Sequence, residues 1–371
     1  MAVAAPAPVQ VEGDPAAAQP FRPSLFGWLG RAFVWGAIAA LVLVGPLRSP
    51  GFEVQIFAQA VIYGIIGLSL NVLLGYVGQI SLGQQAFVGI GAFASAYMIS
   101  EQNQSFWIGV VVAVAIGAGQ ALILGGVSLR VTGLYFALVT LSYGLVAERN
   151  IFQIAELTGG GQGQPAPKPP AFDTDWQYYY LCLAFLALVL WIDWRMMRTK
   201  SGRALLALRE NPRVAETLGV NVKLLILFAF IVSGAFAGLG GALLASNDTF
   251  VSPETWSFNL ALIFVIMTVV GGLRSRAGVL LGSAFFALIG YLLDRFGFLQ
   301  DALNAIPGAP DLTNEVAPLV IGPILLLLTL IFTPGGIGQL IRPISAWLGG
   351  GRFDRKLWKR TEEVQIVDVR A

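Results

Sequence analysis

Five uncharged hydrogen-bonding side chains cluster around a Gly- and Gln-rich interruption, residues 78–85, in a long apolar run. They are Asn71, Gln79, Ser81, Gln84 and Gln85. Amides and freed backbone groups at membrane depth are tolerated where they line a cavity. Such groups suit the brief passage of a small polar or zwitterionic solute, and they equally suit hydrogen bonding to neighbouring helices. The five residues are therefore a candidate translocation path, with helix packing as the alternative.

The sequence offers few residues for catalysis, metal binding, nucleotide binding or proton coupling. The 371-residue chain has no histidine, one cysteine (Cys182) and no GxxxxGK[ST] loop for nucleotide phosphates. Histidine-based catalysis, histidine-ligated metals and an intrachain disulfide are therefore excluded, and no cofactor is expected. Glu148 and Asp193 lie at the ends of apolar runs, where we expect them to reach water. Proton coupling is disfavoured, and a pumping function would need energy from another subunit.

A basic segment, 195–222, has the features of a docking element. Ser201 is expected to cap a helix with apolar residues on one face, Asn211-Pro212 to break it, and Gly219 to close a second short turn. The apolar stripe is expected to enter a groove on a partner, with charges setting the orientation. The alternative is an ordinary basic loop. The candidate docking residues are Arg203, Leu205, Leu208, Arg209, Glu210, Asn211, Arg213, Glu216 and Gly219.

Long apolar runs predict that these residues are carried by membrane-spanning helices. The chain is 56% hydrophobic and 12% charged, whereas soluble domains are about 25% charged. A spanning helix needs about 20 apolar residues. The uncharged runs predict an all-α integral membrane protein with about ten spans. The runs are 32–47, 54–100 (counted as two), 102–129, 131–147, 176–192, 224–247, 255–273, 277–293 and 316–341.

Lysine and arginine counts predict the orientation. Basic residues are concentrated in 195–223 and in the C-terminal tail, whereas Asp248, Glu254, Asp301 and Asp311 fall between later spans. This places both termini in the cytoplasm. The expected organisation is a disordered cytoplasmic tail (1–24), one transmembrane domain (25–341) that includes the cytoplasmic segment 195–222, and a basic cytoplasmic tail (342–371). The GxxxG pairs Gly234–Gly238 and Gly278–Gly282 predict helix-packing faces.

Several separated motifs, in order, resemble the LivM-type permeases of branched-chain amino-acid ABC importers. They are LSLNVLLGYVGQISLGQQAFVGIGAFASAY (68–97), LYFALVTLSYGLVAERN (134–150), LTGGGQG (157–163), GRALLALRENPRVAETLGVNV (202–222) and the stretch 235–291. The family's coupling loop carries an EAA-type pattern followed by Gly, and Ala215, Glu216 and Gly219 stand at that place. Its SLGH-like motif has Gln84 instead of histidine.

The resemblance implies an ABC importer permease fold in a bacterial inner membrane and no bond chemistry by this chain. It also implies four kinds of neighbour: a second, LivH-like permease, two cytosolic ATPases, an extracytoplasmic solute-binding protein and the lipid bilayer. No nucleic acid is expected. The nearest rival is an importer of urea or short amides. A self-contained channel or secondary carrier would leave 203–219 dispensable, and an intramembrane enzyme ranks last.

Overall fold

The computed structural model describes residues 36, 42–47, 51–131, 133–217, 219–295, 317–333 and 335–341. Of the first predicted span, 32–47, only 36 and 42–47 are included, and the tails 1–24 and 342–371 lie outside the described residues. The long helices of the described part are α2 (Gly51–Leu70), α3 (Gln84–Ser100), α4 (Phe106–Ser128), α5 (Leu134–Arg149), α7 (Asp175–Arg198), α10 (Val222–Asp248), α11 (Phe258–Gly271), α12 (Arg276–Arg295) and α14 (Ala317–Phe332).

Each predicted span from 54 onward overlaps one of these helices, several of which extend beyond the predicted bounds. Among the residues that the structure describes, four helical stretches are long and apolar enough to cross a membrane by length and composition: 51–77, 106–128, 175–198 and 222–248. The remaining helices are shorter or less uniformly apolar. The predicted division of the run 54–100 is confirmed, because helix ends at Val77 and resumes at Gln84.

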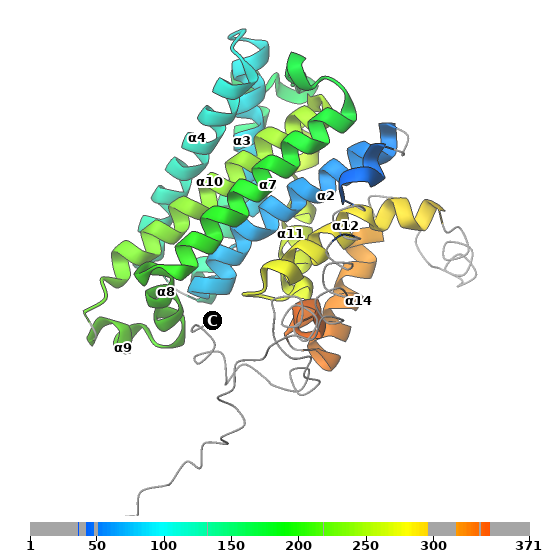
Figure 1. The fold of residues 1–371 in the computed structure, drawn as a ribbon. Helices are drawn as coiled ribbons and strands as arrows, with labels where there is room; N and C mark the ends of the chain where they lie inside the picture. The colour runs from blue at the N-terminus through cyan, green and yellow to red at the C-terminus, as the bar shows by residue number, and fades with distance from the viewer. Residues whose placement is uncertain are drawn as a thin grey trace, which may run out of the picture.

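Helix α10 lies at the centre of the arrangement. It packs against α4, α3 and α2, whereas α2 also packs against α7 and α12. In Figure 1, α2, α3, α4, α7 and α10 run side by side with a shared tilt, and α11, α12 and α14 lie on the far side of α2. Helix α2 therefore joins the α3–α4–α10 group to the α11–α12–α14 group.

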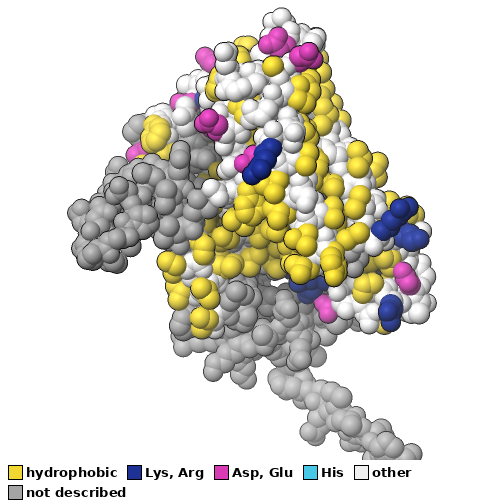
Figure 2. All heavy atoms as spheres, turned by 180° about the vertical axis from the view of Figure 1, so that it is seen from behind, with side chains coloured by type: hydrophobic (Ala, Val, Ile, Leu, Met, Phe, Trp, Pro, Cys, Tyr) yellow, Lys and Arg dark blue, Asp and Glu magenta, His cyan; other side chains and the backbone are white. Residues whose placement is uncertain are grey.

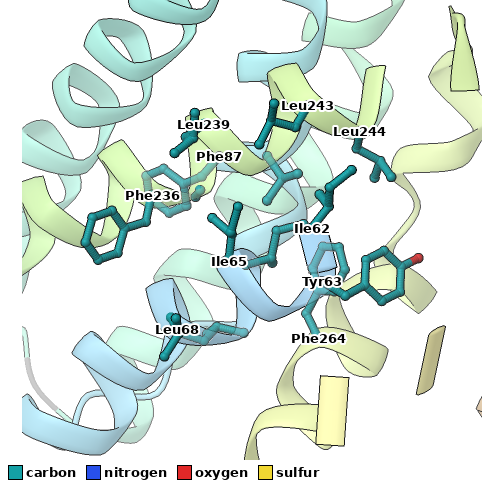
Figure 3. Close-up of a cluster of buried hydrophobic side chains, with 14 of the residues drawn as sticks. Ile62, Tyr63, Ile65, Leu68, Phe87, Phe236, Leu239, Leu243, Leu244 and Phe264 are labelled. Carbon is teal, nitrogen blue, oxygen red and sulfur yellow. The ribbon is translucent and has the colours of Figure 1, made fainter. Parts of the chain in front are cut away.

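The core between these groups is apolar and aromatic. Figure 3 shows Ile62, Ile65 and Leu68 of α2 facing Phe236, Leu239 and Leu243 of α10, with Phe87 of α3 nearby. Phe264 of α11 meets Tyr63 of α2 edge to face, with ring centroids 5.5 Å apart. Such offset geometry is the favoured one for aromatic pairs.

Small residues let α10 approach its neighbours closely. A Cβ built on Gly234 would collide with the backbone oxygen of Gly117 in α4, and one on Gly238 would collide with that of Ala113. Gly278 and Gly282 approach Gly271 of α11 in the same way. Both GxxxG pairs are therefore helix-packing faces, as predicted.

Short elements connect α5 to α7 and α10 to α11. The first connection holds the 3₁₀ turns Ile151–Gln153, Gly160–Gln162 and Pro170–Phe172, the short helix α6 (Ala155–Thr158) and strand β1 (Gln164–Pro165). The second holds strand β2 (Phe250–Val251) and the 3₁₀ turn Pro253–Trp256. Strands β1 and β2 pair antiparallel, with Gln164 opposite Val251. This small sheet is absent from the all-α prediction because two-residue strands carry no periodic signal.

Charge is separated along the bundle. In Figure 2 a broad hydrophobic band crosses the described surface, acidic side chains gather toward one end, and most basic side chains gather toward the other. The basic end carries α8 (Lys200–Glu210) and α9 (Pro212–Thr217), which lie beyond the ends of α7 and α10 in Figure 1. An apolar belt between two charged ends is the surface expected of a protein solvated by a bilayer.

Candidate translocation path and coupling segment

The interruption after α2 begins with a change of helix type. Residues Asn71–Val77 form a π-helix, which ends at Gly78 in a left-handed conformation (φ 80°). The backbone N–H of Gln79 donates to the carbonyl of Leu73 (3.0 Å), and that of Leu82 donates to Thr140 Oγ1 of α5 (3.0 Å). The non-helical residues 78–83, called here the helix break, therefore have some of their backbone groups satisfied by other elements. π-Helical turns are frequently found at functional sites.

All five predicted path residues are buried at or beside the helix break, Asn71, Gln84 and Gln85 completely. Their partners lie on different elements. Gln84 Nε2 donates to Ser69 Oγ, whose own carbonyl accepts from Ser233 Oγ of α10 (2.8 Å). Ser128 Oγ of α4 donates to Gln79 Oε1. The structure thus gathers the residues around the break, but it joins them to several neighbouring helices.

Several of these polar atoms are buried without a partner among the described residues. They are Asn71 Nδ2, Ser81 Oγ, Gln84 Oε1 and both amide atoms of Gln85. Gln85 lies against Gly144 of α5, where a Cβ would collide with its Nε2. A buried amide left unsatisfied costs about 1–3 kcal/mol. These atoms are the ones around the break whose hydrogen-bonding capacity is not used by the described residues of this chain.

The sequence-based reading missed the hydroxyl groups that serve this region. Ser69, Ser128, Thr140 and Ser233 are all buried, and each bonds to the break or to the helices beside it. The available signal is a polar residue within an otherwise apolar helix, since such groups commonly bond between membrane helices. Serine and threonine are frequent enough in these helices that this signal alone does not single them out.

The basic segment 195–222, called here the coupling segment, contains the two predicted short helices, α8 and α9. Helix α8 ends at Glu210, Asn211 is extended, and Asn211 Oδ1 accepts from the N–H groups of Arg213 (3.1 Å) and Val214 (3.3 Å) to cap α9. Gly219 follows α9 with φ 79°, as its predicted closing role requires. The predicted cap at Ser201 is wrong, because α8 already begins at Lys200, after Thr199.

The apolar face of α8 points into this chain and not toward a partner, contrary to the prediction. Leu205 and Leu208 are buried in this chain's own core, and α8 packs against α7, α10 and the π-helix. They are therefore not available to enter a groove on a partner. The outward face is formed by exposed residues of both short helices: Arg203, Arg213, Val214, Glu216 and Thr217. Val214 is 52% exposed.

Arg209 and Glu210 reach back toward the helix break. Arg209 Nη1 donates to the carbonyl of Gly75 in the π-helix, and its aliphatic stem lies over Gly78. Glu210 pairs with Arg274, in the turn between α11 and α12, at 2.9 Å. The coupling segment thus contacts the π-helix that carries Asn71.

Asp193 does not reach water, contrary to the prediction from the sequence. It is completely buried, its Oδ2 pairs with Arg276 Nε and accepts from Tyr76 Oη (3.1 Å), and Arg276 Nη2 donates to its carbonyl (3.3 Å). Buried charges are expected to be paired in this way. The useful signal in the sequence was a lone Asp and an Arg assigned to the same side of the membrane. Glu148 is half-buried and its Oε2 accepts from the N–H of Phe258 (3.0 Å).

The geometry defines a multi-pass helical membrane protein with a polar helix break and a two-helix element at its basic end. Residues 53–329 match the family model described as the permease component of branched-chain amino acid transport systems. The chain belongs to this family.

Individual relatives agree. The chain is similar to the high-affinity branched-chain amino acid transport system permease protein LivM of Escherichia coli, with 29% identity over 83% of this chain and 75% of that protein. A probable LivM of Methanocaldococcus jannaschii is 24% identical over 74% of this chain and 90% of its own length. A probable LivH from that organism is 35% identical over 38% of this chain and 42% of its own. No solved structure matches the chain significantly.

Proposed function

We propose that this chain is the LivM-like permease subunit of an ABC importer that moves branched-chain amino acids across a bacterial inner membrane. The observation that carries the proposal is the family match over 53–329, which includes both the helix break and the coupling segment. The relatives named above are permease proteins of branched-chain amino acid transport systems. The chain's own contribution is a path and its gating, without a nucleotide site.

The proposed mechanism is alternating access. A loaded binding protein docks at the acidic end, two ATPases bind the outward face of α8 and α9, and a second, LivH-like permease completes the path. Closure of the ATPases moves α8 and α9, and the two permeases rock about the path. Exposure of Arg203, Arg213 and Glu216 supports this face as the docking surface, because charged rims set the orientation of a partner.

The proposed topology has about ten spans with both termini in the cytoplasm. Residues 1–24 and 342–371 are cytoplasmic tails, and 25–341 form the membrane domain. The separation of acidic from basic side chains at the two ends of the bundle supports this orientation (Figure 2). In this arrangement α8, α9 and the 272–275 turn face the cytoplasm.

The proposed solute contacts are Asn71, Gln79, Ser81, Gln84 and Gln85. Their support is the combination of burial with unpartnered amide and hydroxyl atoms within the described region. Uncharged donors and acceptors fit an amino-acid zwitterion that must leave as readily as it enters. Urea or a short amide would meet the same groups, so the solute is decided by measuring uptake of each.

Purification of the tagged chain from its native membrane in mild detergent, followed by mass spectrometry, tests the subunit role. The expected result is recovery of a second permease and two ATPases. As a matched test of the docking face, Glu216→Lys is expected to lose the ATPases and keep the second permease. Recovery of the chain alone, active in transport without ATP, would establish a self-contained carrier instead.

A further inference from the structure

The carbonyl of Gly75 is held by two arginines from distant parts of the chain. The π-helix ends at Val77, so carbonyls in its last turn lack partners farther along the helix. Gly75 O accepts from Arg209 Nη1 of α8 and from Arg274 Nε at 3.4 Å. These bonds connect the π-helix both to the coupling segment and to the turn that precedes α12.

Arg274 makes two further contacts at this point. Its backbone N–H donates to Asn71 Oδ1 (2.8 Å), and its Nη2 pairs with Glu210 Oε1 of α8 (2.9 Å). The Arg274 side chain is 13% exposed, whereas that of Glu210 is 64% exposed. Arg274 therefore touches the end of α8, the end of the π-helix and one of the candidate path residues.

The backbone of Arg274 is held in an unusual conformation. Its φ is 66°, in the left-handed region that residues with a side chain rarely adopt. In this conformation the backbone N–H of Arg274 donates to Asn71. At the same time its guanidinium contacts Gly75 and Glu210. Residues held in such conformations cluster at functional and switching sites.

We propose that Arg274 is a positioning residue that links movement of α8 to the helix break at 78–83. The inference rests on the proposed function, in which partner ATPases move α8 and α9. Displacement of α8 carries Arg209 and Glu210 with it, so the Gly75 carbonyl and the Arg274 guanidinium are both displaced. Arg274 transmits that displacement to Asn71 through its backbone N–H. Because the helix break directly follows the π-helix, a movement of the π-helix also moves the break.

The two partners of the ion pair differ in exposure: the Glu210 side chain is 64% exposed, whereas that of Arg274 is 13% exposed. When the Arg274–Glu210 contact opens, the Glu210 carboxylate returns to water and is not left as an unpaired buried charge. A guanidinium is needed because it donates in two directions from one rigid plane, which a lysine ammonium on a flexible stem does not reproduce. A purely structural role, as a cap on the π-helix, would need only the bond to Gly75.

The test uses the whole importer, purified with its partners and reconstituted in liposomes. Uptake of labelled leucine and hydrolysis of ATP are measured together, and the readout is leucine moved per ATP hydrolysed. Variants Arg274→Gln, Arg274→Lys and Glu210→Gln are compared with Arg149→Gln, the same change at an exposed arginine on α5. The melting temperature of each complex is recorded, so that a loss of folding is detected separately.

The expected result for Arg274→Gln is about a tenfold fall in leucine per ATP, while ATP hydrolysis continues, since the guanidinium contacts to Gly75 and Glu210 are no longer made together. Arg274→Lys gives an intermediate ratio, and Arg149→Gln leaves it unchanged. Glu210→Gln alters an exposed group, so the complex is expected to assemble even if the Arg274→Gln complex does not. For Glu210→Gln we expect leucine per ATP to fall about threefold.

An unchanged ratio in both Arg274→Gln and Glu210→Gln would overturn the inference. The inference would also be overturned if uptake and ATP hydrolysis fell by the same factor and the melting temperature fell as well. That result would mean that Arg274 serves only to stabilise the end of the π-helix. Failure of the proposed function is distinguishable from either result. In that case the unaltered complex itself shows no ATP-dependent uptake, before any variant is compared.

Discussion

At the scale of single residues, Asp193 fixes the relation of three elements. It lies in α7, its ion-pair partner Arg276 begins α12, and its hydrogen-bond donor Tyr76 belongs to the π-helix. A buried carboxylate is expensive unless it is paired and hydrogen-bonded. This cost favours the observed packing of α7 beside α12, because an arrangement that separates these helices would leave Asp193 without its ion-pair partner.

Replacing Asp193 with alanine is expected to destabilise the protein by about 3 kcal/mol, because the half-buried Arg276 loses its counter-charge and Tyr76 loses its hydrogen-bond acceptor. The expected observation is a clear fall in the melting temperature of the detergent-solubilised protein. Asp173→Ala, at an exposed aspartate, is the control and should melt like the unaltered protein. Equal melting temperatures for the Asp193 and Asp173 variants would contradict this account of the ion pair.

The sequence identified polar residues well and their partners poorly. Asn71, Gln79, Ser81, Gln84 and Gln85 stand out because amides are rare in apolar runs, and the structure buries all of them. Their partners come from far along the chain: Asn71 bonds to the N–H of Arg274, and Asp193 to Arg276. Pairings across such separations depend on helix packing, which the local pattern does not encode.

At the scale of elements, the packing of α10 depends on the absence of side chains at Gly234 and Gly238. The lines of small residues bring its backbone against α4, so van der Waals contact replaces the hydrophobic driving force that is missing in lipid. Helix breaks and closures were also predictable, since Gly78 and Gly219 adopt the positive φ that glycine permits.

Gly238→Ala is expected to destabilise the bundle by about 1–3 kcal/mol, because the new methyl group would collide with the backbone of Ala113 in α4. The matched control is Gly119→Ala in α4, where a Cβ meets nothing within 4 Å. Melting temperatures of both purified variants provide the measurement. A Gly119 variant that melts lower than the Gly238 variant would refute the packing argument.

The coupling segment illustrates what an amphipathic pattern can and cannot predict. The pattern predicted correctly that Leu205 and Leu208 share a face, and the break at Asn211 was also correct. It did not indicate what covers that face. The covering surface is this chain's own α7, α10 and π-helix, which come together only in the folded bundle.

Glu216→Lys is expected to abolish stimulation of ATP hydrolysis by the permease pair while the chain still inserts and folds, because the residue is exposed on α9. Reversal of a charge at a docking surface both removes an attraction and adds a repulsion. Glu101→Lys, an exposed acidic residue at the end of α3, serves as control. Full ATPase coupling in the Glu216 variant would remove α9 from the docking surface.

At the scale of the whole molecule, charge and hydrophobicity set the proposed orientation in the membrane. The apolar belt and the unequal distribution of basic residues are visible on the surface (Figure 2). From the positive-inside rule we propose that the end that carries α8 and α9 faces the cytoplasm. Single cysteines test this in a Cys182→Ala background, since the native thiol is buried. Glu156→Cys should be labelled from outside intact cells, and Lys200→Cys only after permeabilisation.

ATP-dependent uptake by the reconstituted importer tests whether this chain is the permease subunit of a branched-chain amino-acid importer. Liposomes containing this chain, its co-purified permease and ATPases, and the binding protein are supplied with labelled leucine, isoleucine and valine, and in parallel with labelled urea. We expect uptake of the amino acids that requires ATP and exceeds uptake of urea. Uptake that proceeds without ATP, or ATP-driven uptake of urea in preference to the amino acids, would contradict this expectation.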